Sequence, residues 1–173
     1  MRNKEIILLL LLTLLAVSCN STEEKQKAAA ARQAELEVKD QDGRTALMRA
    51  IDSGNTEAAR KLVSDGANVN AESASGVTPL MNAAGMGNKE LVELLIARGA
   101  DVNHKTSGNY TPLMAASLVG QAEIVRILLD AGADPTVTDN GGRTAAIYAQ
   151  EKDHAEIAAM LRQKTGESAA GKK

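Results

Sequence analysis

The chain has 173 residues, a formal net charge of −2 and no Trp or Phe, with Tyr110 and Tyr148 as its only aromatic residues. Large aromatic side chains normally supply much of the area buried in a globular core. We therefore expect a thin core built from Leu, Ile, Val, Met and Ala. The small net charge gives no basic footprint for nucleic acid, so no nucleic-acid partner is expected.

The N-terminus carries a short apolar segment behind basic residues. Arg2 and Lys4 precede an apolar run over residues 6–17. A helix of that length covers only about 18 Å, which is short of a hydrocarbon core of about 30 Å. A charged start, a short apolar run and small residues after it predict a secretory signal peptide over residues 1–18. The alternative interpretation is a buried helix or a membrane span.

The single cysteine, Cys19, follows this segment directly. The sequence Leu15-Ala16-Val17-Ser18-Cys19 resembles the cleavage box of bacterial lipoproteins, although Ala16 stands where Leu is usual. The resemblance implies cleavage before Cys19, acylation of this residue and a lipid anchor in the bacterial cell envelope. Asn20 after the cysteine implies the outer membrane, on its periplasmic or surface face. The alternative is a secreted protein with an incidental cysteine; in both cases no disulfide can form within the chain.

A polar, Ala-rich stretch follows the cysteine. Residues 28–31 and Glu35 favour helix. We expect residues 19–38 to form a lipid-anchored tether and a helix that caps the following domain, because Ala34 is in register with Ala67 and Ala100.

The rest of the chain repeats every 33 residues. Equivalent segments begin at Thr45, Thr78, Thr111 and Thr144, and we number them repeats one to four. A constant step indicates one structural unit copied along an axis, each unit burying its apolar face against its neighbours. Such folds present an extended surface.

Other columns keep the same register. Two positions before the Thr lie Gly43, Gly76, Asn109 and Gly142; nine after it lie Gly54, Gly87, Gly120 and Asp153; twelve after it lie Glu57, Glu90, Glu123 and Glu156. The period and the Thr-Pro-Leu motif at 78 and 111 resemble the ankyrin repeat. The resemblance implies an all-α solenoid of four helix-turn-helix repeats joined by β-hairpin-like loops. We expect this domain over residues 39–165, followed by a disordered tail over residues 166–173.

The second repeat shows how each unit is built. Pro79 suits the first turn of a helix that stops at Gly87, and Asn88 can cap a second helix that Gly99 ends. Asn109 replaces a glycine, which is intelligible because Asn adopts the left-handed region more readily than most residues. The family often places His three positions after the Thr. This chain has Met48, Met81, Met114 and Ile147 there, and we expect them to pack between repeats.

The chain shows no constellation typical of catalysis. His154 lies in the column of Asn55, Asn88 and Gln121, so helix capping explains it. His104 has no partner at metal-ligand spacing. We expect no enzyme activity, no metal and no cofactor; an enzyme or a small-ligand binder is the competing class.

In the ankyrin family the loop tips and first helices contact partners. In three such columns the middle repeats are apolar and the outer ones charged or polar, which is the layout of a protein-binding patch. The predicted contact residues are Val77, Met86, Tyr110, Leu118 and Val119, with Asn82, Tyr148, Arg44 and Arg143 beside them. The alternative is that Met86 and Val119 pack between neighbouring first helices as core.

These observations predict a monomeric, membrane-anchored lipoprotein that binds an unidentified protein as a non-catalytic scaffold. A narrower alternative is a periplasmic immunity or inhibitor protein that neutralises a toxin or an enzyme.

Overall fold

The computed structural model describes residues 24–31 and 33–166. The signal peptide over 1–18, Cys19 and residues 167–173 of the tail lie outside the described residues, so their predictions stay predictions. The chain divides after Glu35 into two compact units. In the first unit, residues 24–31 and 33–35 are helical, as the composition predicted. Its role as a cap stays a prediction.

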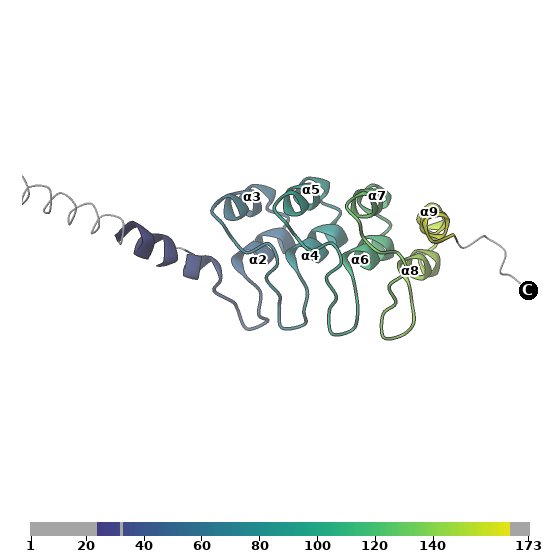
Figure 1. Ribbon diagram of the computed structural model, residues 1–173, viewed down its shortest axis with the longest axis horizontal. Helices are drawn as coiled ribbons and strands as arrows, with labels where there is room; N and C mark the ends of the chain where they lie inside the picture. Colours follow the sequence, from purple (N-terminus) through teal and green to yellow (C-terminus); the bar gives the residue numbers. More distant parts are fainter. Residues whose placement is uncertain (1–23, 32, 167–173) are drawn as a thin grey trace, which may run out of the picture. The chain divides into compact units, whose positions relative to one another are not determined.

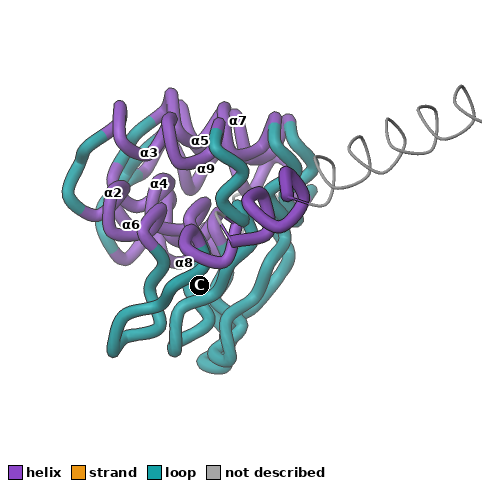
Figure 2. Tube along the Cα trace, turned by 90° about the vertical axis from the view of Figure 1, so that its left-hand side faces the viewer, coloured by secondary structure: helices purple, strands orange, loops and turns teal. Residues whose placement is uncertain are grey.

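The second unit, Leu36–Lys173, contains the repeats. Within its described part every regular element is a helix, so the predicted all-α solenoid is confirmed. Each repeat contributes a first and a second helix. The helices are α2 (Ala46–Asp52), α3 (Thr56–Ser64), α4 (Pro79–Met86), α5 (Lys89–Ala97), α6 (Pro112–Val119), α7 (Ala122–Asp130), α8 (Ala145–Glu151) and α9 (Ala155–Thr165). The first helices form one row, the second helices another, and the loops extend away from the second row (Figures 1 and 2).

The threonine that opens each repeat is the N-cap of its first helix. The hydroxyl of Thr78 accepts a hydrogen bond from the backbone N–H of Met81 at 3.4 Å, and the other three threonines make the equivalent bond. Each one satisfies a donor that the first turn of a helix leaves without a partner. In α4 and α6 a proline follows in the first turn, where its missing N–H costs nothing.

The first helices α4 and α6 end at Gly87 and Gly120, whose φ angles of +76° and +85° are left-handed. Side chains of the next repeat lie close to both glycines. A Cβ on Gly87 would overlap the side-chain amide of Gln121, and one on Gly120 would overlap the ring of His154. The side chain that opens each following second helix therefore lies against the glycine of the preceding repeat.

Two of the four second helices have a side-chain N-cap bond. The side chains of Asn55 and Asn88 accept bonds from the backbone three residues on, as predicted for Asn88. In the described structure Gln121 and His154 hold the same N-cap position without a side-chain capping bond. The capping role predicted for His154 is therefore wrong. The reason is that its ring packs against Gly120 instead.

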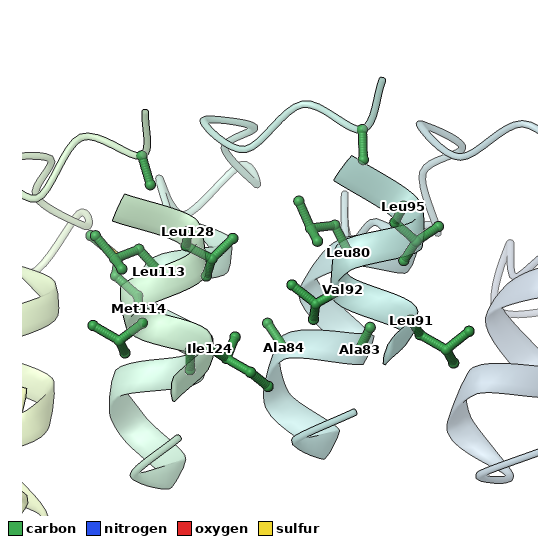
Figure 3. Packing of buried hydrophobic residues seen from close by; sticks show 14 of the residues in the cluster. Leu80, Ala83, Ala84, Leu91, Val92, Leu95, Leu113, Met114, Ile124 and Leu128 are labelled. Carbon is green, nitrogen blue, oxygen red and sulfur yellow. The ribbon is translucent and has the colours of Figure 1, made fainter. Parts of the chain in front are cut away.

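The core lies between the two rows of helices and contains aliphatic side chains almost alone. Leu80 and Leu113 of the first helices, and Leu95 and Leu128 of the second, are at most 1% exposed (Figure 3). Alanines on the first helices, such as Ala83 and Ala84 on α4, allow those helices to approach closely. First helices consequently contact one another more extensively than second helices do.

Three of the four residues in the column three positions after the Thr are buried as expected, and the fourth is not. Met48, Met81 and Met114 are at most 3% exposed, whereas Ile147 is 37% exposed. Ile147 belongs to the last repeat, so no further first helix in the described chain covers it.

The connecting loops are hairpin-like. In each repeat one backbone bond closes the turn, as from the N–H of Ser73 to the carbonyl of Val77 at 2.9 Å. Asn109 adopts the predicted left-handed conformation, with φ of +58°. Asn70 joins neighbouring repeats, because its amide donates to the carbonyl of Gly99 and accepts from the N–H of Asp101. Asn103 makes the same pair of bonds one repeat later.

Candidate protein-binding face

Residues from four columns define the surface that we call the inner face. It consists of the residues one position before, four after and seven to eight after each Thr. In repeat one, Arg44 Nη1 lies 3.2 Å from Asp52 Oδ2. The Nδ2 of Asn82, from the next repeat, donates to Asp52 Oδ1 at 2.6 Å. In repeat four, Arg143 lies 3.8 Å from Glu151 in the same relation. The bond between Asn82 and Asp52 joins the inner faces of repeats one and two.

Three of the predicted residues meet between repeats one and two. Arg44, Val77 and Asn82 line an open pocket of about 240 Å³, together with Met48, Asp52, Ser73 and Ser75. Val77 is half-buried in this wall. The pocket is mainly polar, since its apolar lining comes only from Val77 and the buried Met48.

The centre of the inner face exposes apolar side chains. Met86 is 54% exposed and Val119 is 49% exposed, at the same column of consecutive repeats. The alternative that these two side chains are core is therefore wrong. Leu118 is intermediate, because one part of it packs against the core and the rest reaches solvent. Met86 and Val119 are thus large apolar side chains exposed at equivalent positions of neighbouring repeats.

The two tyrosines form a cluster with Arg143. The rings of Tyr110 and Tyr148 meet edge to face, with centroids 5.5 Å apart and an interplanar angle of 88°. The guanidinium of Arg143 lies 4.5 Å from the centroid of the Tyr148 ring. Edge-to-face and cation–π contacts of this kind both stabilise the arrangement. Tyr110 is half-buried, so its ring packs against Tyr148 while part of its surface remains accessible.

Tyr148 is not available to a partner. It is only 6% exposed, and its hydroxyl donates to Asp139 Oδ2 at 2.6 Å. The sequence placed Tyr148 among the candidate contact residues, and the structure corrects that role. The Tyr148 ring packs against Tyr110, and Asp139 in the loop of repeat four supplies a buried acceptor for its hydroxyl.

Asp139 organises this cluster. One carboxylate oxygen accepts from the N–H groups of Gly141 and Arg143, and the other accepts from the guanidinium of Arg143 at 2.9 Å. The Tyr148 hydroxyl and the bonds from Arg143 hold the pKa of Asp139 well below its usual value. Burial and the bond to Asp139 raise the pKa of Tyr148 to about 12. Burial raises the pKa of Tyr110 as well. Both phenols therefore stay neutral at physiological pH.

The described residues contain no cluster of potential metal ligands. No three His, Cys, Asp or Glu side chains within residues 24–31 and 33–166 converge as metal ligands would. The Nε2 of His104 lies 3.0 Å from the carbonyl oxygen of Gly76, in a contact that joins two loops. The helices of this same part are too short or too polar for any of them to span a bilayer.

Comparison with known families identifies the fold. A family model described as ankyrin repeats (3 copies) matches residues 3–106, 72–139 and 105–169. The chain belongs to the ankyrin-repeat family. Ankyrin-repeat proteins are generally non-catalytic binding scaffolds for other proteins, so a protein partner is implied. No curated protein matches the chain significantly.

Two features of the ankyrin repeats were not predicted from the sequence. The capping role of the buried threonines could have been found, because Thr is a preferred N-cap and precedes the helix in all four repeats. The support that Asp139 gives to Tyr148 and Arg143 could not, since these contacts form only when loop and helix meet.

Proposed function

We propose that this ankyrin-repeat protein is a lipid-anchored protein of the bacterial cell envelope that binds a protein partner through its inner face and performs no catalysis. The observation that carries the proposal is the exposure of Met86 and Val119 at the same column of consecutive repeats. Tyr110, at the loop of the same repeat as Val119, supplies an aromatic ring that packs edge to face against Tyr148.

Such a surface suits a protein rather than a small ligand. An apolar centre with a polar rim is typical of protein interfaces, and Tyr and Met are enriched there. A fixed ring binds at low entropic cost because it loses little freedom on contact. Here Arg44 and Arg143 supply the polar rim in repeats one and four.

The membrane location rests on the N-terminal sequence. A signal peptide over 1–18 and acylation of Cys19 would attach the chain to a bilayer, with residues 19–38 as the tether and capping helix. More than one acyl chain gives stable anchoring. The tether would leave the inner face free to bind a partner near the membrane.

Paired substitutions test the binding role. Val119→Asp places a charge on the inner face, and Val38→Asp places the same charge on an exposed valine outside it. Both side chains are exposed, so neither change should unfold the array. Tagged full-length chains would be recovered from bacterial membranes with their bound proteins. We expect one protein to be retained by the parent and by Val38→Asp but lost from Val119→Asp.

Two results would contradict the proposed binding role of the inner face. A retained protein that Val119→Asp does not release would place the binding site elsewhere. Recovery of no saturable partner by any form would contradict the scaffold role. For the anchor, we expect Cys19→Ser to abolish palmitate labelling and to release the protein from membranes. Labelling that persists in this variant would contradict acylation at Cys19.

A further inference from the structure

The inner face differs sharply in charge between its middle and its ends. Equivalent 16-residue segments hold the loop tip and first helix of each repeat: 40–55, 73–88, 106–121 and 139–154. The two middle segments contain no Asp, Glu, Lys or Arg. The first contains Asp40, Asp42, Arg44, Arg49 and Asp52, and the last contains Asp139, Arg143, Glu151, Lys152 and Asp153.

The charges at the two ends are largely neutralised within the chain. At one end Arg44 pairs with Asp42 and Asp52, and Arg49 lies 3.5 Å from Asp40. At the other end Arg143 pairs with Asp139 and Glu151. A charge that is already paired at short range exerts only a weak net attraction on a distant opposite charge. Each end segment holds three acidic and two basic residues, so the ends have a net charge of only −1 each, and the middle segments have none. The inner face therefore has little uncompensated charge that would steer a charged partner toward it.

From this pattern we infer that the partner segment bound by the inner face is uncharged and apolar along the two middle repeats. This inference rests on the proposed function. We call the middle surface the neutral window; it comprises Val77, Gly85, Met86, Tyr110, Leu118 and Val119. A charged side chain buried against the window would lose water and gain no ionic partner, which is unfavourable.

The size of the window sets the length of the segment. Packed helices lie about 8–10 Å apart, so two repeats span about 20 Å. That distance corresponds to about 13 residues of helix or about six residues of extended chain. The ion-paired ends mark its limits. We therefore expect the uncharged stretch of the partner to be this long, with charged residues only beyond it.

Gly85 gives a direct way to alter the charge of the window. It lies in α4, and a Cβ built on it would meet no described atom within 4 Å. A long side chain can therefore project from this position without displacing the core. Gly85→Glu and Gly85→Gln add side chains of nearly the same shape that differ in charge. Neither disturbs a buried group, so a loss of binding would not reflect unfolding.

The probe is a random 16-residue peptide library displayed on phage and selected on the full-length chain in detergent. Some selected peptides should bind the parent chain but not Val119→Asp. We expect the central residues of these peptides to be uncharged and apolar. Gly85→Glu should weaken them by about tenfold or more, and Gly85→Gln by less than about threefold. Their affinity should change less than about twofold between about 0.05 and 0.5 M NaCl, since few exposed charges take part.

Three outcomes would overturn the inference. Peptides that need the inner face but carry central charges, or weaken more than about tenfold in that salt range, would overturn the neutral window and leave the protein-binding role intact. Failure to select any peptide sensitive to Val119→Asp would overturn both. Dimerisation of the chain alone, abolished by Gly85→Glu in sedimentation experiments, would show a second copy as the occupant.

Discussion

Gly85 and Gly87 lie two residues apart, and the same substitution should have opposite effects at the two positions. Gly85 is inside α4, with open space at its Cβ position, whereas Gly87 is left-handed and faces Gln121. An alanine inside a helix is more stable than a glycine by about 0.5–1 kcal/mol. At a left-handed position an alanine costs about 1–2 kcal/mol.

The overlap with Gln121 adds little to that cost, because the end of a flexible side chain can move aside. Gly85→Ala should thus raise the free energy of unfolding by about 0.5–1 kcal/mol, and Gly87→Ala should lower it by about 1–2 kcal/mol. For an array of this size 1 kcal/mol corresponds to about 3–5 °C in Tm. Thermal unfolding followed by far-UV circular dichroism measures both effects, because the array is helical.

A double variant separates the two causes at Gly87. Compared with Gln121→Ala alone, Gly87→Ala/Gln121→Ala should still lose about 1–2 kcal/mol, since the left-handed backbone remains. A lower Tm for Gly85→Ala would refute the open space at that position. An unchanged Tm for Gly87→Ala would refute the left-handed end of α4.

Three further predictions concern the core and the tyrosine cluster. Leu128→Ala removes a fully buried side chain and should cost about 2–5 kcal/mol in chemical denaturation; a loss no larger than that of the half-exposed Leu94→Ala would contradict the assigned core. The hydroxyl of Ser117 is buried without a hydrogen-bond partner in the described chain, so Ser117→Ala should gain about 1 kcal/mol, and a loss would show that the hydroxyl is bonded. Because the pKa of Asp139 is lowered in the folded chain, its carboxylate stabilises the fold above a pH of about 4, and this contribution is lost at lower pH. The Tm of Asp139→Asn should therefore fall below that of the parent at neutral pH and approach it in acid, whereas a gap independent of pH would rule out the ionised carboxylate as the cause.

The fold could be predicted from the sequence because the same signals for helix starts and ends recur in every repeat. Thr78-Pro79 marks the start of a first helix, Gly87 its end and Asn88 the start of the next helix, and all three assignments are confirmed. An unusual residue in one repeat can also be interpreted from the residues at the same position of the other repeats. Asn109 could be assigned a left-handed backbone because glycines hold its column elsewhere, and its φ angle confirms the assignment.

The candidate site could be predicted only in part. The register placed Met86 and Val119 in a surface column, but exposed and packed positions both tolerate Met and Val, and only the structure shows their exposure. Tyr148 occupies a column that also reaches the inner face through Asn82. Its burial depends on Asp139 and Arg143, which lie in the preceding loop. No periodic pattern encodes such a contact, because it occurs in one repeat alone.

The central claim is that the inner face contacts a protein in the cell, and site-specific photo-crosslinking tests it most directly. A photoreactive residue would replace Met86 or Val119 in the full-length chain, and Glu93 on the second helix α5 would serve as the control. We predict that both inner-face positions form an adduct with the same protein and that position 93 forms none. Adducts of equal yield from position 93, or no protein adduct from either inner-face position, would contradict the claim.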